Sequence, residues 1–272
     1  MPLRGVWVLT LSVNLPGPVA ASRLCAMGAS VVKIEPPGGD PLARMCPGYY
    51  QDLSAGQKVV RLDLKDQQER ASLDDRLEGT DLLLTANRPA ALGRLGLSWT
   101  ELHARFPRLC QVAIVGHPPP DEDVPGHDLT YQARFGTLSP PGMPPVLVAD
   151  LAGAERAVSA ALSLLFARER GQGAGYEQVA LSEAARTFAG PLHQGLTTPD
   201  GVLGGAFPLT VCTAPGMATW RSPPSNRTSG NGCRRNSGWK AKVVKTWNGS
   251  SRRRPPNNGR SGRRITTSHL LQ

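Results

Sequence analysis

The sequence predicts an α/β fold with a Rossmann-like open parallel sheet and flanking helices, followed by a disordered basic tail. Strand-like apolar runs alternate with helical patterns from residue 6 to residue 116, which is typical of a parallel sheet. Beyond about Phe207 the periodicity is lost, and Pro, Ser, Asn, Gly and Arg dominate. The charge changes in the same region, because 13 of the 31 Lys and Arg residues follow Asp200 but none of the 21 Asp and Glu residues does.

Each expected element follows from its apolar pattern and its end signals. Strands are expected at residues 6–12, 31–35, 58–65, 81–85, 109–116 and 176–182. Helices are expected at residues 17–28, 66–79, 98–106, 150–170 and 183–190. Ser98 and Glu101 have the spacing of a capping box at the start of the third helix. The fourth helix has the broadest apolar face, formed by Leu151, Ala154, Val158, Ala161, Leu162 and Leu165.

The formal net charge of +10 belongs to the tail. Residues 1–200 hold 18 basic and 21 acidic side chains, so the predicted folded part gives no nucleic-acid signal. The 5 cysteines include no CxxC pair, which argues against a disulfide framework and against a zinc site. The apolar run at the N-terminus is short and interrupted by prolines. We therefore expect a cytoplasmic protein with no membrane partner.

Two stretches hold residues with catalytic potential. "PGHDLTYQ" contains His127 and Asp128, and "VLVADLAGA" contains Asp150. An isolated histidine in a loop is most often a surface residue, and Asp150 could serve as the N-cap of the helix that it begins. A carboxylate at a helix N-terminus is also held ionised by the helix dipole, which suits a base or a nucleophile.

The order of seven motifs resembles a known family. The motifs run from "LPGPVAASRLCAMGASVVKIEPPGGD" through "QKVVRLDLKD", "DLLLTANRPAALGRLGLSWTEL" and "PRLCQVAIVGH" to "PGHDLTYQA", "VLVADLAGA" and "LLFARERGQGAGYEQVALSEA". They are similar to the class III CoA-transferase (CaiB/BaiF) family, which includes formyl-CoA transferase, carnitine CoA-transferase and α-methylacyl-CoA racemase. The resemblance covers roughly residues 4–207.

This resemblance implies a CoA thioester substrate and an interlocked homodimer. Asp150 matches the catalytic aspartate of the family, which is a nucleophile in the transferases and an acid/base group in the racemase branch. His127 matches the histidine of the racemase "GHD" motif, so the resemblance is closest to α-methylacyl-CoA racemase. The implied reaction is epimerisation of a 2-methylacyl-CoA. The alternative is CoA transfer between carboxylic acids through a covalent Asp150 intermediate.

The chemistry of racemisation requires two such groups. Inverting a carbon α to a thioester needs one group to remove the proton and a second to return it on the other face. Nearby donors must also stabilise the enolate. His127 and Asp150 are 23 residues apart, which is less than the family usually shows, because the loop "GTLSPPGMPPV" is abbreviated.

CoA carries phosphates, and several basic residues are candidates to bind them. Arg88 and Arg94 match basic family positions near the nucleotide, and Arg44, Lys58 and Lys33 are further candidates. The alternative is that each is an ordinary solvated surface charge. No metal and no separate cofactor is expected, since coenzyme A is part of the substrate.

The resemblance divides the chain into residues 1–207, the family's large domain, and residues 208–272, which replace its small domain. The family continues with a sequence such as "PYxVYxxxDGxxxAxxALEPxFW". Reverse translation of Pro208 onwards, read from the third base of each codon, permits Pro-Tyr-Gly-Val-Tyr. The codons for Arg221 to Gly232 permit Val-Ala-Ala-Leu-Glu-Pro-His-Phe-Trp-Glu-Arg in that frame. The tail is therefore interpreted as the family's continuation translated out of frame.

Two other interpretations of the tail remain. Trp220, Trp239 and Trp247 among clustered arginines could form a nucleic-acid-binding arm, although GC-rich DNA read out of frame gives the same composition. The whole chain could also be an inactive fragment or a binding module, because the lost domain should supply part of the active site.

Overall fold

The computed structural model describes residues 1–205, which contain a six-stranded sheet in the order β3-β2-β1-β4-β5-β6. Every pair of neighbouring strands is parallel. The strands are β1 (Trp7–Thr10), β2 (Ser30–Glu35), β3 (Lys58–Arg61), β4 (Leu82–Thr85), β5 (Cys110–Val115) and β6 (Tyr176–Ala180). The predicted Rossmann-like α/β fold is confirmed.

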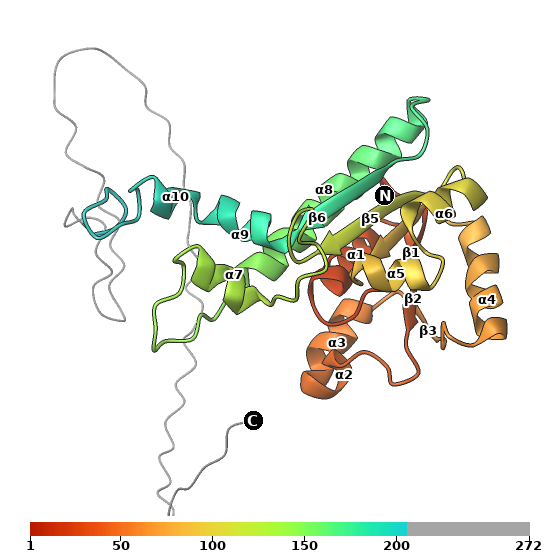
Figure 1. The fold of residues 1–272 in the computed structure, drawn as a ribbon, viewed down its shortest axis with the longest axis horizontal. Coiled ribbons are helices and arrows are strands. Elements are labelled where there is room, and N and C mark those ends of the chain that lie inside the picture. Colours follow the sequence, from red (N-terminus) through yellow and green to blue (C-terminus); the bar gives the residue numbers. More distant parts are fainter. Residues whose placement is uncertain (206–272) are drawn as a thin grey trace, which may run out of the picture. The chain divides into compact units, whose positions relative to one another are not determined.

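Helices connect the strands and continue after the last one (Figure 1). The first five are α1 (Pro16–Ala26), α2 (Leu42–Met45), α3 (Pro47–Ser54), α4 (Gln67–Glu78) and α5 (Pro89–Arg94). The others are α6 (Trp99–Arg105), α7 (Asp128–Arg134), α8 (Val148–Glu169), α9 (Leu181–Phe188) and α10 (Gly190–His193). The helices α7, α9 and α10 lie beyond the β5–β6 side of the sheet in Figure 1.

Each face of the sheet has its own hydrophobic core, because alternate residues of a strand point to opposite faces. Val8 is paired with Leu82 and belongs to the core that contains α1 and α8. Leu9 is paired with Leu83 and belongs to the core that contains α4, α5 and α6. The central strands are therefore covered on both sides, as expected for a parallel sheet.

The elements that were predicted differ from the observed ones mainly at their ends. The strand expected at 58–65 ends at Arg61, and the helix expected to begin at Asp150 begins at Val148. The short helices α2, α3, α5, α7 and α10 were not predicted. The Ser98–Glu101 capping box is present at the start of α6. The proposed tail, residues 208–272, lies outside the described residues.

None of the helices within residues 1–205 combines the length and the apolar character that crossing a membrane would require.

Candidate active site

A cavity of about 570 Å³ opens at the carboxyl edge of the sheet. Its walls come from the segments that follow β1, β4 and β5, and from the first residues of α7, α8 and α9. The chain crosses to opposite sides of the sheet after β1 and β4, which are neighbours at the centre. Ligands of open α/β sheets bind at this kind of switch point. The cavity is therefore the leading candidate for an active site.

His127 and Asp150 both line this cavity. His127 precedes the first residue of α7 with an extended backbone, and its N–H donates a hydrogen bond of 3.0 Å to Thr130 Oγ1. The side chain of His127 is exposed, whereas Asp150 is half-buried and is the third residue of α8. The fold thus brings both sequence-predicted candidates to one cavity from the starts of two different helices.

Asp128 supplies the hydrogen-bond acceptor at the start of α8. Its Oδ2 accepts hydrogen bonds from the backbone N–H groups of Ala149, at 2.7 Å, and Asp150, at 3.1 Å. Gln132 donates to Oδ1 of the same carboxylate through Nε2. The expectation that Asp150 is the N-cap is therefore wrong. Asp150 lies inside the first turn of α8, and the buried carboxylate of Asp128 from α7 accepts from two backbone N–H groups of that turn.

The pKa of Asp150 is raised from 3.8 to about 6. Burial is the larger cause, because it disfavours the charged form, and the negative charge of Asp128 is the second. The carboxyl consequently has a larger protonated fraction near neutral pH than an ordinary aspartate has. Such a group can donate a proton as the carboxylic acid, its minor form, and accept one as the carboxylate, its major form.

The predicted phosphate-binding residues occupy different places. Arg88 precedes α5 and lines the cavity, with its side chain exposed. Arg44, Lys58 and Arg94 are exposed and do not line the cavity. Their expected contacts with CoA stay predictions.

A second pocket of about 230 Å³ shares Val13 and Asn87 with the first cavity. Its walls are largely apolar, with Leu62, Leu92 and Leu95 among them, and Lys65 is its cationic residue. Lys65 is not among the phosphate-binding residues expected from the sequence. The sequence signal was present, since Lys65 lies in the segment that follows a parallel strand, and such segments form the ligand-binding edge of the sheet.

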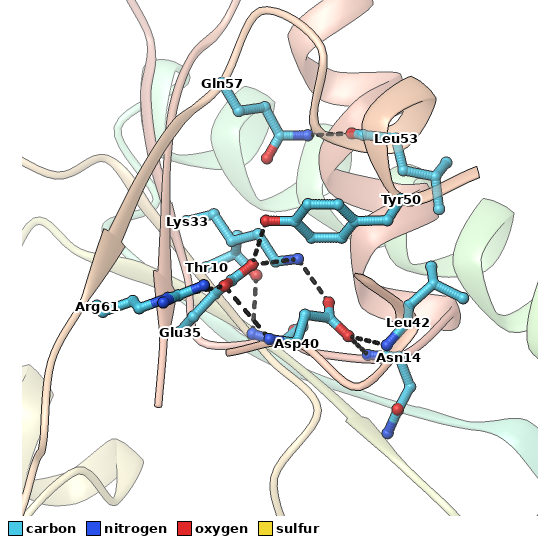
Figure 2. Close-up of polar contacts among 11 residues, drawn as sticks. Thr10, Asn14, Lys33, Glu35, Asp40, Leu42, Tyr50, Leu53, Gln57 and Arg61 are labelled. Carbon is cyan, nitrogen blue, oxygen red and sulfur yellow. Dashed lines mark hydrogen bonds and ion pairs between the residues drawn. The ribbon is translucent and has the colours of Figure 1, made fainter. Parts of the chain in front are cut away.

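Lys33, by contrast, is not available to bind a phosphate. Its side chain is 1% exposed, and its ammonium lies 2.5 Å from Asp40 Oδ2 and 3.1 Å from Glu35 Oε1. Figure 2 shows the ammonium group between the two carboxylates, with the Tyr50 hydroxyl donating to Glu35 at 2.8 Å. The expectation of a phosphate contact is wrong at this residue, because a buried charge requires internal partners.

This buried cluster orders the wall of the cavity. Asp40 Oδ1 accepts hydrogen bonds from the N–H groups of Asn14, at 3.0 Å, and Leu42, at 2.9 Å (Figure 2). Asn14 has φ of 68°, a conformation that L residues seldom adopt. Both residues line the cavity. Asp40, which is paired with Lys33 through its other oxygen, therefore connects the segment after β1 to the start of α2.

No set of three or more His, Cys, Asp and Glu side chains within residues 1–205 has an arrangement that could hold a metal ion. Cys25, Cys46 and Cys110 are free thiols.

Comparison with known proteins identifies the family. The sequence model of CoA-transferase family III matches residues 3–205, which is most of the chain. The chain belongs to CoA-transferase family III. This family III chain is 31% identical to the probable fatty acyl-CoA transferase Rv3272 of Mycobacterium tuberculosis, over 68% of the chain and 51% of that protein. It is 34% identical to cinnamoyl-CoA:phenyllactate CoA-transferase of Clostridium sporogenes, over 62% of the chain and 46% of that enzyme.

Solved structures agree with this family assignment. A crystal structure of Rv3272 has a TM-score of 0.66 and 30% identity, covering 72% of this chain and 59% of the other. A CaiB/BaiF family protein from Brucella suis has a TM-score of 0.66 and 25% identity, covering 74% and 59%. This family III chain spans about half the length of the curated relatives named above.

Proposed function

We propose that the chain acts on acyl-CoA thioesters and epimerises 2-methylacyl-CoA by moving the α-proton between His127 and Asp150. The observation that carries this proposal is that one cavity is lined by an exposed imidazole and a carboxyl whose pKa is raised to about 6. A 1,1-proton shift needs one group that removes the α-proton and a second group that returns it, and this cavity holds two candidates.

In one direction, neutral His127 removes the α-proton and becomes an imidazolium. The electron pair of the C–H bond moves onto the thioester oxygen to give an enolate. Protonated Asp150 then returns a proton to the α-carbon on the other face and becomes a carboxylate. In the reverse direction the Asp150 carboxylate takes the proton and the His127 imidazolium delivers one, so neither direction consumes a co-reactant.

The two pockets suggest how CoA is held. We infer that the thioester end enters the larger cavity, and that the nucleotide end occupies the smaller pocket beside it. Support comes from their shared residues Val13 and Asn87, and from the cations Arg88 and Lys65 at the two pockets. Apolar walls suit an adenine ring, and a lysine suits a phosphate.

CoA transfer is the second candidate, favoured by the names of the curated relatives, which are CoA-transferases. In that reaction the Asp150 carboxylate attacks the thioester carbonyl, the C–S bond breaks, and an acyl-aspartyl anhydride and a CoA thiolate form. The partly buried, mostly ionised carboxyl is compatible with this attack as well.

One pair of measurements tests the proposal on the full chain. The purified protein is incubated with a 2-methylacyl-CoA in deuterated water, and deuterium at the α-carbon is followed by NMR. In parallel, the protein is treated with borohydride or hydroxylamine in the presence of the acyl-CoA, and peptide mass spectrometry detects covalent modification of Asp150. Deuterium incorporation without Asp150 labelling supports the racemase. Labelling of Asp150 without exchange supports the transferase, and the absence of both contradicts acyl-CoA chemistry for this chain.

A further inference from the structure

A tyrosine with a buried hydroxyl lies at the candidate active site. Tyr131 of α7 is 1% exposed, and it lines the cavity together with His127 and Asp150. Its hydroxyl has no hydrogen-bond partner among the residues that the structure describes. Buried hydroxyl groups are nearly always hydrogen-bonded, because leaving one unpaired costs free energy. The unpaired Tyr131 hydroxyl at the wall of a cavity therefore points to a ligand atom as its partner.

Two glycines make room for this hydroxyl. A Cβ atom at Gly116 would lie 2.6 Å from Tyr131 Oη, and one at Gly126 would overlap the same oxygen. Both glycines line the cavity. Any larger residue at either position would displace the hydroxyl. The ring itself is held from the side by His117, whose ring packs edge-on with the centroids 5.2 Å apart. The position of the hydroxyl is thus set by the surrounding fold.

The hydroxyl is a donor and not a proton-transfer group at neutral pH. Burial raises the pKa of Tyr131 from 10.0, and the negative charge of Asp150 raises it further. A phenol that keeps its proton can stabilise an anionic oxygen by hydrogen bonding without giving the proton away.

We propose that Tyr131 is a further catalytic residue whose hydroxyl donates a hydrogen bond to the carbonyl oxygen of the bound thioester. This inference rests on the proposed acyl-CoA function and applies to both candidate reactions. During α-proton removal the electron pair of the C–H bond moves onto that oxygen, and during attack by Asp150 the C=O electron pair moves onto it. In both cases Tyr131 keeps its proton, and the negative charge develops on the oxygen that it contacts.

The test compares two ligands that differ at one oxygen. Titration calorimetry measures the binding of an acyl-CoA thioester and of the matching S-alkyl-CoA thioether, which lacks the carbonyl oxygen, to the full chain. We expect the native protein to prefer the thioester by about 10-fold, the value of one good hydrogen bond. Tyr131→Phe should lose that preference and keep its affinity for the thioether. The matched control is Tyr176→Phe, because Tyr176 stacks on Trp99 outside the cavity.

Stability separates ligand recognition from a structural role. Tyr131→Phe removes an unpaired buried hydroxyl and keeps the ring, so the melting temperature should not fall. If Tyr131→Phe lowers the melting temperature and reduces the affinity for both ligands equally, Tyr131 acts structurally and the inference is overturned. An unchanged thioester preference in Tyr131→Phe would also overturn it, while binding of the thioether would leave the acyl-CoA function standing. Failure of the native protein to bind either ligand would overturn both proposals.

Discussion

The carboxylate of Asp128 is hydrogen-bonded to the backbone N–H of Asp150 at 3.1 Å, and its negative charge helps to raise the pKa of the Asp150 carboxyl. The same oxygen of Asp128 binds the N–H of Ala149 at 2.7 Å. One buried side chain thus fixes the beginning of α8 and influences the protonation of the candidate catalytic acid that α8 carries.

Asp128→Asn should lower the pKa of Asp150, because it removes a negative charge and leaves an amide oxygen that can still accept from the backbone. In the pH dependence of kcat/KM for α-proton exchange, the limb due to Asp150 should move to lower pH. Glu155→Gln is the control, since Glu155 lies on α8 but is exposed and paired with Arg23. An unshifted limb in Asp128→Asn would show that Asp128 does not control this titration.

Asp150→Asn should abolish activity and stabilise the fold at alkaline pH. The folded-state pKa of Asp150, about 6, lies above the usual 3.8, so the carboxyl destabilises the fold increasingly as pH rises from 4 to 6 and fully above that. After allowance for partial exposure, the variant should gain about 1–2 kcal/mol at pH 8. Urea unfolding at pH 4 and pH 8 measures the difference in the free energy of unfolding between Asp150→Asn and the native protein. This difference should nearly vanish at pH 4. An equal effect at both values would contradict the raised pKa.

His127→Gln separates the two candidate reactions. If His127 is an acid/base group, α-proton exchange should fall by about 10²–10⁴-fold, while covalent capture at Asp150 should not change. His193→Gln is the control, because Nε2 of His193 contacts the Phe135 carbonyl at 2.9 Å and His193 does not line the cavity. Equal exchange rates for His127→Gln and the native protein would remove His127 from the mechanism.

Lys33→Met should destabilise the fold by about 3–5 kcal/mol, because it leaves the buried Asp40 without a cation and Glu35 with only the exposed Arg61 at 4.0 Å. Lys58→Met is the matched control, since Lys58 is an exposed lysine on the neighbouring strand. Urea denaturation at pH 7 provides both values. A cost below about 1 kcal/mol at Lys33 would mean that the cluster is not a stabilising ion-pair network.

Sequencing the gene around the codons for Ala206 to Leu209 should reveal a shift of reading frame. The prediction comes from a family-like peptide that the degenerate codons of residues 208–232 permit in another frame. Restoring the frame should yield a chain whose similarity to the family continues beyond the matched residues 3–205. A confirmed DNA sequence that encodes the present tail, with no family-like peptide in the alternative frame, would refute this interpretation.

The sequence alone predicts the strongly patterned elements. The helix α8 could be predicted because it is long and has a continuous apolar face, and α6 because Ser98 and Glu101 mark its first turn. The strands could be predicted from their apolar runs, although the run at 58–65 continues beyond the end of β3. Helix α7 has seven residues, which is too few turns for a period to stand out from a loop.

Contacts between distant residues could not be predicted. Asp128 and Asp150 were both visible in the sequence, but a hydrogen bond across 22 positions depends on how α7 packs against α8. Lys33 was expected to be a phosphate-binding candidate or a solvated charge, because nothing in a strand pattern shows that Asp40 folds back over it. Tyr131 belongs to the motif "PGHDLTYQ", but nothing in that motif shows whether its hydroxyl is buried or paired. Its significance depends on burial and on the missing partner of its hydroxyl.

The link through Asp128 has a consequence for the abbreviated segment between α7 and α8. His127 is bonded covalently to Asp128, and Asp128 is hydrogen-bonded to Asp150, so the shortest route between the candidate pair bypasses residues 135–147. Gln132 anchors the far end of that segment through the Val146 carbonyl at 3.1 Å. Lengthening or shortening the stretch around Ser139 to Met143 should therefore leave the catalytic spacing intact, which makes it a natural place for an inserted tag or reporter.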